Sequence, residues 1–304
     1  MSALWHHWSF DPVILAVAVT IWAHEIGLAR LRQHSRPERN VWRRQHAWFF
    51  YAGLALLLVT IVSPLDYWAS SYLYVHMIDH VIAAFFVPIL VVYGAPWIPL
   101  MFALPVKARR RVGKFIYLNS KTSGLRAVGR VVRSPLFAVI SFNASMLFWH
   151  IPWAFELSEH NGFVHVWLMH GSFLVTGTLF WLQLMASHPM KPARGTGWKI
   201  GAILVTNALM TFLAMSMSFF TTTSWYSTYD HVPGVSLSPF AGQQIAAALL
   251  WVCGDFWALP ALATIIRRHL ERGAPNVAPV LDEWTGRVQM SVEEFRGAVN
   301  DASS

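Results

Sequence analysis

The sequence predicts an all-α integral membrane protein, a bundle of seven transmembrane helices with its N-terminus outside the cytoplasm and its C-terminus inside. Three observations lead to this prediction: a composition poor in charge, apolar segments of membrane-spanning length, and the distribution of lysine and arginine. Of the 304 residues, 55% are hydrophobic and 12% are charged, whereas soluble domains carry about 25% charged residues. The mean hydropathy of +0.43 agrees with the membrane class.

The apolar segments approach the ~20 residues that are needed to cross a bilayer. We expect seven spans, at residues 12–31, 45–62, 74–104, 135–153, 163–186, 199–220 and 240–266. The third segment is long and contains Pro88 and the sequence Gly94-Ala95-Pro96. We therefore expect it to span the membrane and then to kink or to lie along the surface.

The basic residues alternate between connections. All 23 lysine and arginine residues fall within 30–44, 107–133, 191–199 and 267–296. The positive-inside rule then predicts an extracytoplasmic N-terminus at 1–11, a seven-helix transmembrane domain at 12–266 and a cytoplasmic tail at 267–304. The net charge of +8 thus belongs to cytoplasmic loops, which we expect to meet anionic lipid and no nucleic acid. Cys253 is the single cysteine, which excludes an intrachain disulfide and a cysteine-based zinc site.

A pair of histidines opens the third segment. His76 and His80 are one helical turn apart, so both imidazoles lie on one face, about 5–6 Å apart, with Asp79 beside them. Ionisable groups inside a membrane are costly and are by default functional, and imidazole and thioether groups are ligands for copper. We predict an outward-facing His/Met copper site with this pair at its core. The alternative is that these histidines cap helix ends or bond backbone carbonyls near the interface.

Further candidate ligands lie on the same side of the predicted bundle. The fourth segment ends with His150, the fifth begins with His165, Met169 and His170, and the sixth ends near Met217. His165 and His170 are five residues apart, about 140° around an α-helix, so they do not easily face one point. We favour His170 as the inward residue because Gly171 and Ser172 next to it suit close helix packing. Methionines at such positions also serve as core packing.

A second polar group lies deeper, towards the cytoplasm. Its candidates are His24 and Glu25 on the first segment, His46 at the start of the second and Asp255 on the seventh. No lysine or arginine lies in the hydrocarbon to neutralise the two acids, so they must be protonated, pair with histidine or border water. We interpret this inner polar cluster as a structural hydrogen-bonded group rather than an ion path.

Taken in order, these motifs resemble those of the CtaG-type cytochrome c oxidase assembly factors. The signature HMxxH is matched by His76-Met77-Ile78-Asp79-His80. The other matching motifs are Ser63-Pro64-Leu65, Gly94-Ala95-Pro96, Trp149-His150-Ile151-Pro152, His170-Gly171-Ser172-Phe173 before Phe180-Trp181, and Gln243-Gln244 before Trp251 and Gly254. The resemblance covers residues 15–270. The sequence departs from the family pattern at Val166, where a histidine is expected, and at Gly242, where an acidic residue is common.

The resemblance implies a multi-pass protein of a bacterial plasma membrane that supplies copper to haem–copper oxidase subunits and is not an enzyme. It implies His76, His80, His150 and His170 as the copper-handling residues. The additional or supporting candidates are Met77, Asp79, His165, Met169 and Met217. Two other functions stay open: a copper transporter, which copper uptake into sealed vesicles would reveal, and a bis-His haem protein, which a Soret band would reveal.

Overall fold

A computed structural model describes residues 7–33, 37–273, 277–281 and 287–291. The chain divides into two compact units, Met1–Ala258 and Leu259–Ser304. In the first unit the described secondary structure consists of helices, which agrees with the predicted fold class.

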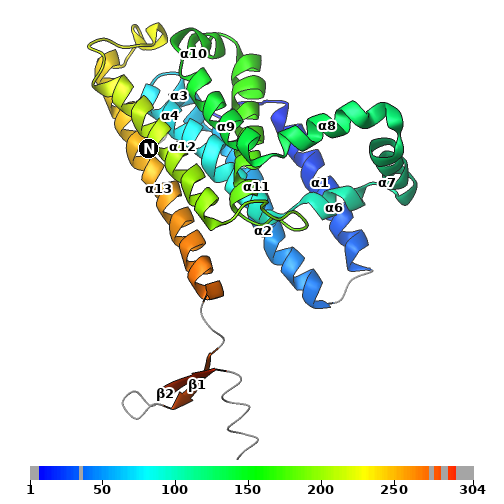
Figure 1. Ribbon diagram of the computed structural model, residues 1–304. Helices are drawn as coiled ribbons and strands as arrows, with labels where there is room; N and C mark the ends of the chain where they lie inside the picture. Colours follow the sequence, from blue (N-terminus) through cyan, green and yellow to red (C-terminus); the bar gives the residue numbers. More distant parts are fainter. Residues whose placement is uncertain (1–6, 34–36, 274–276, 282–286, 292–304) are drawn as a thin grey trace, which may run out of the picture. The chain divides into compact units, whose positions relative to one another are not determined.

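The first half of the chain forms helices that are separated by short breaks (Figure 1). Ser63 caps the N-terminus of α3 by accepting a hydrogen bond from the backbone of Leu65, and Pro64 follows at the first helical position. In order, the elements are α1 (Val13–Arg32), α2 (Pro37–Val62), α3 (Pro64–Ala69), α4 (Leu73–Val81), the π-helix η2 (Ile82–Phe86), α5 (Val87–Gly94), α6 (Trp97–Ala103), α7 (Val106–Gly113), the π-helix η3 (Lys114–Leu118) and the 3-10 helix η4 (Ser120–Thr122).

The second half continues as helices and adds one β-hairpin. The order is α8 (Ser123–Val132), α9 (Pro135–Trp149), α10 (Pro152–Glu159), the π-helix η5 (Val164–His170), α11 (Gly171–Leu184), α12 (Thr196–Ser218), the 3-10 helix η6 (Ser227–Tyr229) and α13 (Pro239–Gly273). The antiparallel strands β1 (Val277–Leu281) and β2 (Arg287–Ser291) pair in the second unit, with Val277 opposite Ser291. This hairpin falls within the predicted cytoplasmic tail and has no counterpart among the predicted elements.

Among the residues that the structure describes, five helices are long and apolar enough to cross a membrane: Val13–Arg32, Arg43–Val62, Leu73–Gly94, Thr196–Ser218 and Pro239–Glu271. The pair α8 and α9 makes a sixth candidate if it is one span, although it bends by 69°. The predicted span at 163–186 corresponds to η5 followed directly by α11, and neither helix alone reaches 18 residues. The structure therefore supports a polytopic membrane protein, and the count of seven stays a prediction.

The predicted break at Gly94-Ala95-Pro96, within the third segment, is confirmed. Helix α5 ends at Gly94, and Ala95 adopts a left-handed backbone with φ of 47° before Pro96 leads into α6. A left-handed residue other than glycine costs about 1–2 kcal/mol, and Pro96 lacks the N–H that would continue the helical ladder. The chain consequently turns, and α6 packs against α1.

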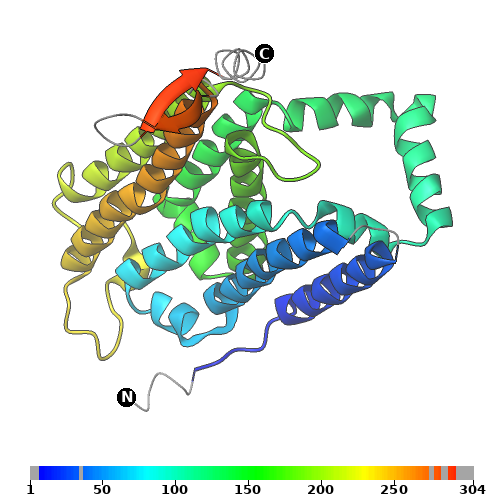
Figure 2. The ribbon, with the colours of Figure 1, turned by 90° about the horizontal axis from the view of Figure 1, so that it is seen from below.

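Two glycines allow helices to approach closely. A Cβ at Gly27 of α1 would lie 1.8 Å from the carbonyl oxygen of Pro99 on α6. A Cβ at Gly177 of α11 would lie 2.5 Å from the carbonyl oxygen of Ala84 in η2. Close backbone contact at small residues is a common way for membrane helices to associate. It brings α11 against η2 and α5, while α2 packs on the other side of α5 (Figure 2).

Candidate metal centre

The histidine pair of α4 lies in the interior of the first unit. His76 and His80 have no exposed surface, and their Nε2 atoms are 2.6 Å apart. Since one imidazole must donate to the other at this distance, the pair shares a single proton between the two nitrogens. The rings contact Phe155 and Phe173, with centroids 4.8 and 5.0 Å from His76 and His80 respectively. The pair is thus held in an apolar environment and faces other helices.

Helix α4 also contributes a buried acid to the same region. Asp79 is completely buried, and its Oδ2 lies 3.0 Å from Nε2 of His170, which is 1% exposed. The His170 ring is 6.0 Å from the His80 ring, measured between centroids. Side chains of α4 and η5, which are distant along the chain, therefore meet. The preference for an inward His170 is in keeping with this placement.

A third helix supplies His150 at its C-terminal end. Nδ1 of His150 donates a hydrogen bond to the carbonyl oxygen of Met146 at 2.7 Å, because a carbonyl can only accept. Nε2 is buried without a hydrogen-bond partner, and in the neutral ring it carries the lone pair. The ring centroid lies 5.8 Å from that of His80. A backbone-fixed imidazole with a free lone pair is the usual form of a histidine metal ligand.

His165 joins the cluster, contrary to the expectation that it and His170 face different directions. Their ring centroids are 4.8 Å apart. The expectation assumed an α-helix, but Val164–His170 is a π-helix. In a π-helix the hydrogen bonds run from i to i+5, so residues five apart lie on the same side. The helix type thus brings both imidazoles to one face.

Two acids that the sequence analysis did not propose complete the cluster. Glu159 ends α10, and its Oε1 lies 3.4 Å from Nδ1 of His76 and 3.1 Å from Nδ1 of His165. Asp66 of α3 lies 4.0 Å from Nε2 of His165, and burial raises the pKa of its carboxyl to about 7. Both acids lie in segments without lysine or arginine. That absence was the available signal, because a buried acid without a basic partner must find a histidine or a cation.

Several polar atoms of this cluster lack hydrogen-bond partners. The buried atoms without such a partner include Nε2 of His150, Nδ1 of His80 and Oδ1 of Asp79. Two sets of three residues place one ligand atom each within 4.8 Å of the others, namely His76 with Glu159 and His165, and Asp79 with His165 and His170. An unpaired buried polar group costs about 1–3 kcal/mol. A bound cation would satisfy several of these groups at once, so the residues fit a metal ion.

The positions of the methionine candidates do not distinguish a ligand from a packing residue. Met77, Met169 and Met217 are completely buried, which suits both core packing and a soft ligand shell. The two ligand groups described above consist of imidazole and carboxylate. This donor set is harder than the predicted His/Met combination and suits Cu(II) as well as other divalent transition metals.

The loop between α12 and α13 lies over this end of the bundle, where α3 and α10 also gather (Figure 1). Tyr226 and Tyr229 donate hydrogen bonds to the backbone carbonyls of His150 and Ala69, both at 2.9 Å. Burial raises the pKa of both phenols, so they remain neutral donors. The loop is attached to α10 as well, because the backbone and hydroxyl of Ser227 both donate to Glu156. The cluster is consequently enclosed.

The inner polar cluster forms only in part. His24 and Glu25 both interact with the hydroxyl of Tyr51, which lies 2.7 Å from Nδ1 of His24. His46 stacks on Tyr93 with ring centroids 5.3 Å apart. Asp255 does not join this group, since its side chain is exposed on α13.

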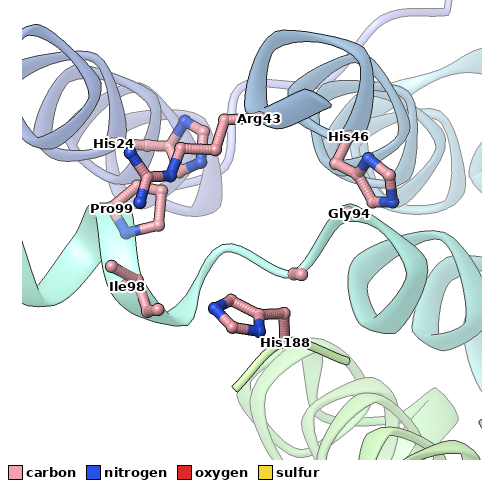
Figure 3. Close-up of a pocket in the computed structure, with 8 residues that line it drawn as sticks. His24, Arg43, His46, Gly94, Ile98, Pro99 and His188 are labelled. Atoms are coloured by element: carbon pink, nitrogen blue, oxygen red, sulfur yellow. The ribbon is translucent and has the colours of Figure 1, made fainter. Parts of the chain in front are cut away.

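A small pocket adjoins the inner cluster. Figure 3 shows His24, Arg43, His46 and His188 around it, next to Gly94. Its volume is about 10 Å³, which is room for about one water molecule. Such a small pocket beside hydrogen-bonded side chains favours the structural interpretation over an ion path.

Fold and site together define a polytopic helical membrane protein with a buried cluster of histidines and carboxylates. The chain belongs to the cytochrome c oxidase caa3 assembly factor family, whose model matches residues 22–272. It is also similar to a protein of Mycobacterium bovis and one of Mycobacterium tuberculosis, both described as uncharacterized, with 26% identity over 267 residues. The match covers 85% of this chain and 38% of each relative, so the chain spans well under half of their length. No solved structure matches it.

Proposed function

We propose that this protein assembles a haem–copper oxidase by holding a copper ion at the buried cluster and passing it to an oxidase subunit. The ligands that we assign are His76, His80, His150 and His170. Asp79 and His165 complete the cluster, and Glu159 is an additional ligand that the structure adds to the candidates. The family supports the assembly role, and the copper role is our inference.

One observation carries the proposal: the gathering of five imidazoles and three carboxylates from α3, α4, α9, α10 and η5 with several polar atoms unpaired. A purely structural histidine would have its ring nitrogens satisfied by backbone or side-chain partners. Nε2 of His150 is buried and has no such partner. Neutral imidazole nitrogen is a good copper ligand, and carboxylate oxygen is compatible with the divalent ion.

We further propose the seven-span topology, with η5 and α11 as one span and with the N-terminus outside the cytoplasm. Helix α3, helix α10 and the loop at 219–238 contain no lysine or arginine, and the positive-inside rule assigns such connections to the outside. This orientation puts the cluster at the outer surface of the plasma membrane of a bacterium, where it can meet an oxidase subunit.

The basic cytoplasmic loops fit contact with anionic lipid. On α8 the apolar side chains of Leu125, Val128 and Val131 are 56–58% exposed, and they recur every three residues. Arg126 and Arg130 lie on the same short helix. An amphipathic helix of this kind lies in the membrane interface with its apolar face down.

Enclosure of the cluster implies that copper enters and leaves through a movement. The loop at 219–238 is the candidate for this movement, because Tyr226 ties it to His150 through one hydrogen bond. Contact with an oxidase subunit would release the loop and open the site. The ion is thereby protected from water until the partner is present.

The test is metal analysis of the purified full chain after loading with copper, with oxidase activity measured in the same cells. The variant is His76→Ala with His80→Ala. The matched control is His160→Ala with His269→Ala, since both of these histidines are exposed and neither lies in the loop at 219–238. We expect the first pair to lose bound copper and oxidase activity and the control to retain both. Equal copper content in the first pair and in the wild type would refute the assigned site.

A further inference from the structure

A half-open apolar groove runs along α11, with walls from α1, α2, α5 and α6. Its volume is about 510 Å³. Along α11 and the end of η5 it extends from Trp167 to Leu182, a rise of about 22 Å at 1.5 Å per residue. His170 lies in its wall and also faces Asp79 at 3.0 Å. The groove therefore ends next to the buried cluster.

The walls of the groove are almost entirely hydrocarbon. Among the described residues that line it, His170 is the one ionisable side chain. The walls include α1 and α2, which are long and apolar enough to span a membrane. The groove thus lies at the depth of the lipid tails, and an occupant at this depth has to be apolar.

The size of the groove restricts the occupant further. A helix about 10 Å wide with a pitch of 5.4 Å fills about 420 Å³ per turn. A spanning helix has five or six turns, so at this volume per turn it fills about 2,100–2,500 Å³, well above the volume of the groove. A lipid tail reaches about 15 Å, half of the hydrocarbon core, and it fits within the length of the groove.

We propose that this groove holds one hydrocarbon chain of a membrane lipid, which lies along α11 and ends against His170. The chain seals the membrane side of the histidine–carboxylate cluster and offers it no ligand atom. Water is then kept out from the bilayer side, and the imidazoles keep a constant environment. The inference goes beyond the proposed function and does not require a bound metal.

The test uses the full chain in vesicles of phosphatidylethanolamine and phosphatidylglycerol that carry a photoreactive diazirine in one acyl chain. Mass spectrometry then locates the labelled residues. We expect at least fivefold more labelling in the groove walls, residues 13–20 and 167–182, than at Leu204 and Phe212, which are exposed on α12. Equal labelling of all lipid-facing helices would overturn the proposal. A Soret band at one porphyrin per chain, or a co-purified polypeptide cross-linked in the groove, would overturn it as well.

A matched pair of variants tests the same point through the amount of bound lipid. A Cβ at Gly171, in the groove wall, meets no atom within 4 Å, and the same holds at Gly201 on α12, outside the groove. Gly171→Phe fills the end of the groove near His170, whereas Gly201→Phe adds the same ring elsewhere. We expect native mass spectrometry to show a loss of at least fivefold in retained lipid for the first variant only. Retention of lipid by a folded Gly171→Phe protein would refute the assignment, and if that variant does not fold, Leu179→Trp takes its place.

Discussion

Replacing Gly177 with alanine tests how the close packing of α11 supports the cluster. The added Cβ would lie 2.5 Å from the carbonyl oxygen of Ala84 and 2.8 Å from Cγ of Pro88. Both distances are far below van der Waals contact, so α11 has to move away from η2 and α5. Overpacking of this kind costs about 1–3 kcal/mol, and alanine returns about 0.5–1 kcal/mol through its better helix propensity. We expect a net loss of about 0.5–2 kcal/mol.

The matched control is Gly171→Ala, because a Cβ at Gly171 meets no atom within 4 Å. This variant keeps the gain in helix propensity without the collision, so the two variants should differ by about 1–3 kcal/mol. The assay is unfolding in mixed micelles with increasing denaturing detergent, followed by circular dichroism. Copper content should fall in Gly177→Ala as well, since movement of α11 separates His170 from Asp79. Equal stability of the two variants would show that the contact between α11 and η2 is not tight.

Three further predictions concern the site and the loop that covers it. Tyr226→Phe leaves the carbonyl of His150 without its donor, so we expect the free energy of unfolding to fall by about 1–3 kcal/mol. Copper should also exchange faster, which is measured with a chelator. An unchanged exchange rate argues against the loop as the gate. Glu159→Gln should weaken copper binding by about tenfold or more in metal titrations. The control Glu156→Gln changes an acid three residues earlier and should leave the affinity for copper unchanged. Equal affinities of the two variants would contradict the role of Glu159. Hydrogen bonds from Ser227 hold the pKa of Glu156 below its usual 4.5, so this pair stabilises the fold above pH 4.5 and the contribution is lost as the pH falls through the lowered pKa. Melting temperatures between pH 3 and 6 should therefore fall less steeply in Ser227→Ala than in the wild type, and parallel curves would exclude the effect.

The sequence predicts the helical elements well where the signal is local. The predicted spans at 12–31 and 199–220 correspond to α1 and α12 within three residues at each end. The histidine pair of α4 is recognised because a spacing of four residues defines one face of an α-helix. Hydropathy, breaks at proline and spacing on a helix depend on neighbouring residues only, so the chain reveals them without its fold.

The composition of the cluster depends on features that the sequence does not display. His165 and His170 share a face only because η5 is a π-helix, and spacing alone implies the opposite. Glu159 enters because the end of α10 places its carboxylate 3.4 Å from His76 on α4. Asp255 does not belong to the inner polar cluster, because it lies on an exposed face of α13. These outcomes depend on helix type and on packing between segments that are distant along the chain.

The sequence by itself determined the membrane class, the approximate spans and the histidine pair, since these follow from composition and short-range periodicity, and its ordered motifs indicated the family. Only the tertiary structure decided which imidazoles and acids meet, that the cluster is enclosed, and that a groove reaches it from the side. The physical reason is that a side chain's direction and burial depend on helix type and on which helices approach closely. Those properties arise when the helices pack together.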